Sequence, residues 1–283
     1  MENQSIRSHE RYDRLLRAAK QLPPVTAAVA HPCDEVSLKG ALEAARLGLI
    51  APILVGPPDR VRDVAQQAEL DISGFPLKAS AHSHDSAAKA VELVREGKAE
   101  ALMKGSLHTD ELMGAVVARD GGIRTARRIS HCFVMDVPGH KGPLIVTDAA
   151  VNIAPDLDAK VDIVQNAIDL GHALRFDEVR VAILSAMETV NPKVSSTVEA
   201  AALCKMADRG QITGAILDGP LRSTMRSTRR RRRSSTSFRR LPGALMSWWS
   251  RISKPGTCWP RAFLLLPAPM PPASCSARGC RSS

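Results

Sequence analysis

The sequence lacks acidic residues after Asp218. All 29 Asp and Glu residues lie at or before this position, whereas 14 of the 39 Lys and Arg residues lie between Arg222 and Ser283. The first 221 residues therefore carry a net charge of −4 and the last 62 a net charge of +14. Because the two parts differ so strongly in composition, the overall charge of +10 describes neither of them.

The sequence also has no apolar run of the length that crosses a membrane. Residues 263–272 (FLLLPAPMPP) are too few and too rich in proline. The first 21 residues are charged and follow a helical pattern, without the apolar core of a signal peptide. These absences predict a cytoplasmic protein with no membrane association.

Metal-ligand spacing is lacking as well. Cys33, Cys132 and Cys204 lie far apart, which is typical of small reduced core residues, and the histidines between positions 82 and 108 do not form a spaced cluster. No Gly-x-Gly-x-x-Gly fingerprint and no Gly-x-Ser-x-Gly elbow is present. The sequence therefore predicts no metal and no bound cofactor.

The first 221 residues alternate apolar, strand-like runs with amphipathic helical stretches. This alternation predicts an α/β fold whose parallel sheets are covered by helices on both faces. We expect a first domain over 1–143, an incomplete second domain over 144–221 and a separate basic tail over 222–283. The expected strands cover 25–32, 51–58, 101–105, 131–138, 142–152, 179–186 and 212–221, and the expected helices 34–49, 59–70, 85–99, 108–118, 156–175 and 196–210.

Ligands of parallel sheets gather where strands end and helices begin. One such junction is Lys104-Gly105-Ser106-Leu107-His108-Thr109, where a glycine, hydroxyl groups and a lysine could hold an anion. The same residues are also compatible with a plain turn whose helix is capped by Thr109. His31-Pro32-Cys33-Asp34, after the first strand, is either a second polar junction or only a turn with Asp34 as a helix cap.

Two further segments carry candidate groups. Residues 121–130 (GGIRTARRIS) place three arginines and two hydroxyl groups before a buried strand, as a phosphate-binding loop or as an ordinary solvated loop. Residues 147–152 (TDAAVN) end an apolar strand with a carboxylate and an amide. These groups could orient a thiol or a phosphate, or Asp148 could simply form a turn.

The segments LMKGSLHTDELM, GGIRTARRISHCFVMDVPG, LIVTDAAVNIAPDLDAKVDIVQNAI and GAILDGPL, taken together and in this order, resemble the phosphate acetyltransferase/phosphate butyryltransferase family. The resemblance runs from about residue 20 to Leu221 and is strongest to the short form that accompanies enoyl-CoA hydratase-type domains. It implies a two-domain fold related to isocitrate and isopropylmalate dehydrogenases, an active site in the interdomain cleft and a homodimer. It also implies acyl transfer between coenzyme A, as a substrate, and inorganic phosphate.

The resemblance implies roles for nine residues. Asp148, Ser106 and Arg128 are the expected catalytic residues. The expected residues around the phosphate and the acyl-CoA are Lys104, Gly105, His108, Thr109, Ser130 and Asn152.

Residues 222–283 resemble GC-rich coding DNA translated out of frame. With plausible codons, one fixed offset turns three stretches of this tail into strings similar to the family's continuation, including Val-Pro-Asp-Leu-Glu-Ala-Gly-Asn-Met-Leu from Trp249. We therefore expect a frame change at about Leu221–Arg222, a disordered tail, and an acyltransferase impaired by loss of the family's C-terminal active-site segment. The alternatives are a non-catalytic acyl-CoA- or phosphate-binding module, and a basic tail that binds nucleic acid non-specifically.

Overall fold

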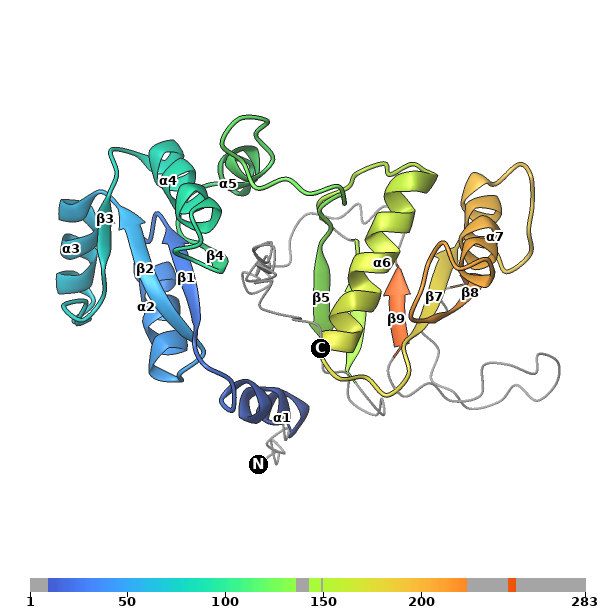
Figure 1. The fold of residues 1–283 in the computed structure, drawn as a ribbon, viewed down its shortest axis with the longest axis horizontal. Coiled ribbons are helices and arrows are strands. Elements are labelled where there is room, and N and C mark those ends of the chain that lie inside the picture. The colour runs from blue at the N-terminus through green and yellow to red at the C-terminus, as the bar shows by residue number, and fades with distance from the viewer. Residues whose placement is uncertain (1–9, 136–142, 149, 223–243, 248–283) are drawn as a thin grey trace, which may run out of the picture. The chain divides into compact units, whose positions relative to one another are not determined.

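The computed structural model describes residues 10–135, 143–148, 150–222 and 244–247. The chain divides into two compact units, one built around Ala18–Arg124 and the other around Thr125–Ala262 (Figure 1). Each unit contains a sheet with parallel strands and packed helices. The predicted α/β fold with parallel sheets is therefore confirmed.

The first unit is built on a four-stranded, fully parallel sheet. Its strands are β1 (Val25–Ala30), β2 (Ile50–Gly56), β3 (Leu77–Ala79) and β4 (Ala101–Lys104), in the order β3-β2-β1-β4. The last four residues of β1 are fully buried, as expected for a strand covered on both faces. The sequence analysis missed β3, which has three residues and no fully buried side chain.

Four helices belong to the first unit: α2 (Glu35–Arg46), α3 (Pro58–Gln67), α4 (Ser83–Arg95) and α5 (Thr109–Val116). The carboxylate of Asp34 accepts a hydrogen bond from the Ser37 amide at 2.7 Å, which confirms Asp34 as the cap of α2. Helices α2 and α4 pack on the sheet. Apolar side chains of α2, α3 and the sheet form one core. Its fully buried members include Val29, Leu38, Leu54 and Val61.

The second unit has a five-stranded mixed sheet in the order β5-β6-β9-β7-β8. Strands β6 (Leu144–Thr147), β7 (Arg180–Ser185), β8 (Ile216–Arg222) and β9 (Ala244–Ser247) are parallel, whereas β5 (Cys132–Met135) runs antiparallel to β6. Helix α6 (Leu157–Ala173) packs on β6 and β9, and α7 (Ser195–Asp208) packs on β7 and β8 (Figure 1). Ile145, Val164, Ile168, Val181 and Leu203 lie in their shared core.

Strand β9 lies within the tail for which the sequence predicted disorder. Ala244–Ser247 pairs in parallel with both β6 and β7. Strands β6 and β7 are not hydrogen-bonded to each other, so each has an edge whose backbone groups need partners. The short apolar segment of β9 provides these partners. Most of the tail, residues 223–243 and 248–283, lies outside the described residues. The disorder expected there therefore stays a prediction.

The boundary between the two compact units does not coincide with the expected domain boundary at 143/144, and the expected domain limits stay a prediction. The second unit begins at Thr125, so the run that includes β5, expected in a first domain ending at residue 143, belongs with β6. The reason is the hairpin-like pairing of Cys132–Met135 with Leu144–Thr147. The N-terminal helical pattern is present as α1 (Glu10–Ala19).

Candidate functional site

The loops after β1 and β4 lie next to each other at one edge of the first sheet. Successive strands β1, β2 and β3 extend the sheet in one direction, and the chain then returns to place β4 on the other side of β1. Open α/β sheets bind ligands at such a reversal, outside the carboxyl ends of the strands on either side of it, which here are β1 and β4. The two loops at this point are the predicted junctions 31–34 and 104–109.

The carbonyl oxygen of His31 ties these loops together. It accepts hydrogen bonds from the Cys33 amide at 2.8 Å, from the Ser106 amide at 2.8 Å and from the Ser106 hydroxyl at 2.9 Å. His31 adopts a left-handed conformation with φ 56°. Gly105 lies so close to this loop that a Cβ atom there would be 2.4 Å from the carbonyl oxygens of Ala30 and His31. The glycine is thus required by close backbone contact.

The Lys104 and Ser106 side chains of the 104–109 junction form hydrogen bonds within the first unit. The Lys104 ammonium donates to the carbonyls of Gly105, at 3.2 Å, and Leu107, at 2.6 Å. The Ser106 hydroxyl donates to His31 and also accepts from the Cys33 amide at 3.3 Å. These contacts fix the shape of the loop, whereas the catalytic and binding roles of Lys104, Gly105 and Ser106 stay predictions.

His108 and Thr109 begin helix α5. The N-cap is His108 and not Thr109, which the plain-turn interpretation had expected at this position. The His108 amide donates to Glu111 Oε2 at 2.7 Å, while Ser83 Oγ donates to Glu111 Oε1 at 2.7 Å. The Ser83 hydroxyl and the His108 amide hold the pKa of Glu111 below its usual value. Glu111 thus joins the N-termini of α4 and α5 beside the candidate loop.

The sequence analysis did not identify a buried polar network behind this loop. The His31 ring, with 6 % of the residue exposed, lies 2.9 Å from Ser86 Oγ through Nδ1, and Ser86 Oγ lies 2.7 Å from Ser80 Oγ. Burial lowers the pKa of His31, and the charge of Arg60 lowers it further, against a smaller opposing effect of Glu111. No local pattern could have revealed a contact between residues 31 and 86, which are 55 positions apart.

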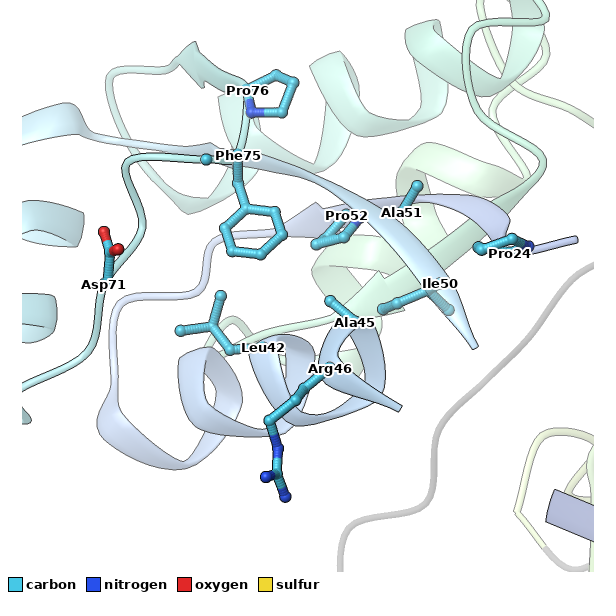
Figure 2. Close-up of a pocket in the computed structure, with 11 residues that line it drawn as sticks. Pro24, Leu42, Ala45, Arg46, Ile50, Ala51, Pro52, Asp71, Phe75 and Pro76 are labelled. Atoms are coloured by element: carbon cyan, nitrogen blue, oxygen red, sulfur yellow. The ribbon is translucent and has the colours of Figure 1, made fainter. Parts of the chain in front are cut away.

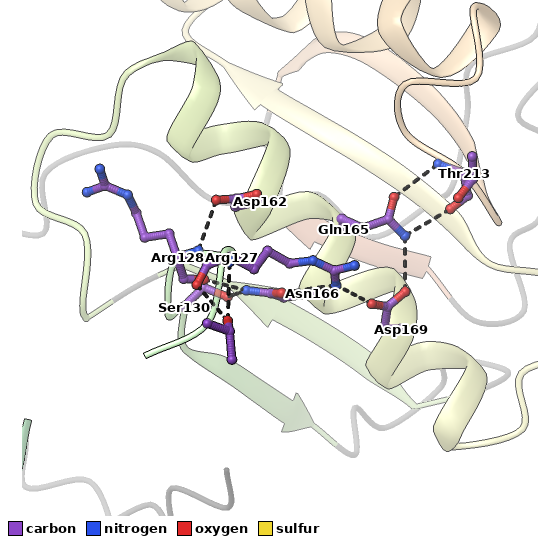
Figure 3. A network of polar contacts seen from close by, with 9 residues as sticks. Arg127, Arg128, Ser130, Asp162, Gln165, Asn166, Asp169 and Thr213 are labelled. Carbon is purple, nitrogen blue, oxygen red and sulfur yellow. Dashed lines mark hydrogen bonds and ion pairs between the residues drawn. The ribbon is translucent and has the colours of Figure 1, made fainter. Parts of the chain in front are cut away.

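The second group of predicted residues lies in the second unit, where Arg128 and Ser130 border helix α6 (Figure 3). The Arg128 amide donates to Asp162 Oδ2 at 2.9 Å, and its carbonyl accepts from Asn166 Nδ2 at 2.8 Å. The same Asn166 Nδ2 donates to Ser130 Oγ at 3.0 Å. The neighbouring Arg127 forms an ion pair with Asp169.

Arg127 and Arg128 therefore differ. The Arg127 guanidinium is held on α6, whereas the Arg128 side chain extends away from the network (Figure 3). Within the described part of the chain, no hydrogen bond or ion pair engages the Arg128 guanidinium. An exposed guanidinium with its planar donors unengaged is suited to a phosphate or carboxylate.

Asp148 and Asn152 form a closed turn after β6. The Asp148 carboxylate accepts from the amides of Ala150 at 3.2 Å, Val151 at 3.1 Å and Asn152 at 3.1 Å, and from the Asn152 side chain. The Asn152 amide group also donates to the Ile129 carbonyl at 3.0 Å, next to Ser130. The turn-forming role that the sequence left open for Asp148 is thus present, and its catalytic role stays a prediction.

The cysteines of the described residues are free thiols, as predicted. Burial raises the pKa of Cys204 to about 11, with a smaller contribution from Asp218, and burial also raises the pKa of Cys33 and Cys132. Protonated thiols are poor nucleophiles. Over the described ranges, no group of three His, Cys, Asp or Glu side chains is arranged to hold a metal ion, and no helix has the length and hydropathy to span a bilayer.

A pocket of about 640 Å³ lies at the opposite edge of the first sheet, near the start of β2 and the end of α2 (Figure 2). The Phe75 ring points toward Leu42 and Pro52, and most of the lining is apolar. Arg46 at its rim is paired with Glu43 at 2.8 Å. None of the nine predicted site residues lines this pocket.

Comparison with known proteins gives a consistent result. Residues 75–235 match the model of the family described as phosphate acetyl/butaryl transferase. Over 211 residues the chain is 63% identical to a phosphate acetyltransferase of Rhizobium meliloti, covering 75% of this chain and 67% of that protein. It is 53% identical over 208 residues to a phosphate acetyltransferase of Rickettsia prowazekii, covering 73% of this chain and 59% of that protein. The match thus spans about three fifths to two thirds of the length of these relatives.

Solved structures show the same fold. A branched-chain phosphotransacylase of Enterococcus faecalis V583 superposes with a TM-score of 0.64 at 22% identity, covering 79% of each chain. A phosphotransacetylase of Streptococcus pyogenes gives a TM-score of 0.61 at 18% identity, covering 77% of this chain and 73% of that one. At these identities the likeness concerns the fold alone.

Proposed function

Because the chain belongs to the phosphate acetyl/butaryl transferase family, we propose that it transfers an acyl group between coenzyme A and inorganic phosphate. The observation that supports this most strongly is the 63% identity to a phosphate acetyltransferase. The relation to isocitrate and isopropylmalate dehydrogenases that the resemblance implied stays a prediction.

The reaction makes demands that the candidate residues can meet. A phosphate oxygen attacks the thioester carbonyl, the carbon–sulfur bond breaks, and the products are an acyl phosphate and the coenzyme A thiol. Phosphate is a weak nucleophile, so it must be desolvated, held and aimed by arginine, hydroxyl and amide donors. In the reverse direction a carboxylate can take the proton of the thiol.

We assign the residues to these tasks as follows. In the second unit, the unengaged Arg128 guanidinium and the Ser130 hydroxyl bind phosphate. In the first unit, the N-terminus of α5 and the Thr109 hydroxyl bind anionic groups of the substrates, and Ser106 joins them once its hydroxyl releases the His31 carbonyl. Asp148 takes the thiol proton, which requires it to release part of its turn, because its oxygens accept four hydrogen bonds there. Lys104, Gly105, His108 and Asn152 shape and support the binding loops.

We further propose that the chain as written turns over slowly. A change of frame near Leu221–Arg222 replaces the C-terminal segment with which the family completes its site. This hypothesis is supported by the composition of residues 222–283, which contain 14 basic and no acidic residues. A cytoplasmic location and a homodimer belong to the same proposal, as does weak, salt-dependent binding of nucleic acid through the basic tail.

The test compares two purified proteins, the 283-residue chain and a version with the frame restored from residue 222. Release of the coenzyme A thiol is measured with acetyl-CoA and butyryl-CoA, with and without phosphate. We expect phosphate-dependent release by the restored protein and little or none by the chain as written. No phosphate-dependent release by either protein overturns the proposed reaction, and equal rates overturn the proposed impairment.

A non-catalytic acyl-CoA- or phosphate-binding module is the second candidate. It is favoured by the engagement of Ser106 and Asp148 within their own loops, which leaves both with structural tasks. Tight binding of acyl-CoA by the restored protein without thiol release supports this candidate against the enzyme.

A further inference from the structure

We propose that Asn166, on helix α6, is the positioning residue that prepares Arg128 and Ser130 to bind phosphate. This inference rests on the proposed function and assigns a task to a residue outside the nine predicted ones. Figure 3 shows the Asn166 side chain reaching from α6 toward Arg128 and Ser130 of the arginine loop, residues 121–130.

Asn166 holds the loop through both ends of its side-chain amide. Its Nδ2 donates to the Arg128 carbonyl at 2.8 Å and to Ser130 Oγ at 3.0 Å. Its Oδ1 accepts from Arg127 Nη1 at 3.4 Å. One side chain therefore contacts Arg127, Arg128 and Ser130, and neither of its amide hydrogens is left to solvent.

Asp162, one helical turn before Asn166, completes the clamp. Its Oδ2 accepts from the Arg128 amide at 2.9 Å, so α6 engages both the amide and the carbonyl of Arg128. Residues four apart lie on the same face of a helix, which explains how two side chains reach one residue. The backbone of Arg128 is fixed on both sides, while its guanidinium remains unengaged within the described residues.

The direction of the hydrogen bond decides what Ser130 can do. An amide NH₂ group is only a donor, so Ser130 Oγ must accept from Asn166. The hydroxyl proton of Ser130 is thereby left to donate to another acceptor. A hydroxyl that can donate, next to an unengaged guanidinium, suits the binding of phosphate oxygens. Asn166 orients the Ser130 hydroxyl for this task without itself contacting the phosphate.

The matched control is Gln165, the neighbour of Asn166 on α6. Gln165 Nε2 donates to Asp169 at 3.0 Å and to the Thr213 carbonyl at 3.1 Å, and its Oε1 accepts from the Thr213 amide at 3.0 Å. It therefore makes as many hydrogen bonds as Asn166 from the same helix, but none of them reaches the arginine loop. Gln165→Leu therefore measures how phosphate affinity changes when α6 loses side-chain hydrogen bonds that do not reach the arginine loop.

The experiment measures the dissociation constant of inorganic phosphate by titration calorimetry, for the 283-residue chain and in parallel for the frame-restored protein, with folding checked by circular dichroism. The variants are Asn166→Leu, Asn166→Asp, Gln165→Leu, Ser130→Ala and the double variant Asn166→Leu/Ser130→Ala. Asn166→Asp keeps the shape, but its carboxylate accepts the Ser130 proton and so reverses the bond. It also serves if Asn166→Leu does not fold.

We expect both Asn166 variants to bind phosphate about tenfold more weakly or worse, and Gln165→Leu to bind like the unaltered chain. Because Asn166 acts through Ser130, the double variant should lose less affinity than the sum of the two single losses. Unaltered affinity in both Asn166 variants, equal losses in Asn166→Leu and Gln165→Leu, or full additivity overturns the positioning role and leaves the proposed function intact. Absence of phosphate binding in both the 283-residue chain and the frame-restored protein overturns this role and the proposed function together.

Discussion

The carbonyl oxygen of His31 accepts two hydrogen bonds from Ser106, one from its amide at 2.8 Å and one from its hydroxyl at 2.9 Å. The second bond joins side chain to backbone across 75 positions of sequence and holds the loop after β1 against the loop after β4. The candidate loop of the first unit therefore owes its shape to a contact between two strand ends.

Loss of the Ser106 hydroxyl should weaken this junction. Ser106→Ala removes the bond to His31 and the acceptor for the Cys33 amide, so we expect the free energy of unfolding to fall by about 1–2 kcal/mol. Urea titration followed by circular dichroism measures the change. A free energy of unfolding equal to that of the unaltered chain means that the hydroxyl does not hold the loops together.

Gly105 and Gly114 provide a matched pair of substitutions. A Cβ at Gly105 would lie 2.4 Å from two backbone oxygens, so Gly105→Ala forces the loops apart and should cost about 2–4 kcal/mol. A Cβ at Gly114, within α5, meets nothing within 4 Å, so Gly114→Ala should stabilise the protein by about 0.5–1 kcal/mol through helix propensity. Thermal unfolding of both variants checks the signs, and a destabilised Gly114→Ala together with a neutral Gly105→Ala contradicts this geometry.

The buried ring of His31 predicts a dependence of stability on pH. Because burial lowers its pKa in the folded state, the unfolded chain takes up a proton first as the pH falls below about 6.5. Stability contributed by the neutral ring is therefore complete above this pH and is lost as the pH falls toward the lower, folded-state pKa.

The corresponding variant is His31→Asn, since asparagine tolerates the left-handed conformation at this position. We expect its free energy of unfolding to fall less between pH 7 and pH 5 than that of the unaltered chain. Parallel pH profiles of the two proteins, measured by urea titration, are incompatible with a neutral buried ring.

Arg127 and Arg128 are adjacent but should respond differently to substitution. Arg127→Ala breaks a half-exposed ion pair with Asp169, which should cost at most about 1 kcal/mol of stability and change phosphate affinity little. Arg128→Ala removes an unengaged guanidinium, which should leave stability within about 0.5 kcal/mol and weaken phosphate binding about tenfold or more. Calorimetric titration with phosphate separates the two, and equal affinities in both variants contradict the assignment of Arg128.

The parts of the fold that the sequence predicted are those with a strong local signal. Buried runs such as 25–32 are recognised by their continuous apolar composition and the amphipathic helices by their period, and their positions agree with β1 and the helices of both units to within a few residues. Strand β3 has three residues and follows Pro76, so no period could form. The antiparallel direction of β5 was not predictable, because an apolar run carries no sign of the direction of its neighbour.

The candidate site shows the same limit. Polar residues at strand ends were identified because position alone marks them, and Arg128 and Ser130 are among them. Asn166 and Asp162 were not identified, since polar side chains on the outer face of an amphipathic helix are usually solvated. Only the folded contact with the arginine loop distinguishes them from their neighbours.

The most direct test of the central claim is the identity of the phosphorus-containing product. The frame-restored protein is incubated with acetyl-CoA and phosphate, acyl phosphate is quantified by ³¹P NMR, and free thiol is quantified in the same sample. Acyl transfer to phosphate predicts one acyl phosphate for each thiol released. Thiol release without acyl phosphate, or neither product, contradicts the account.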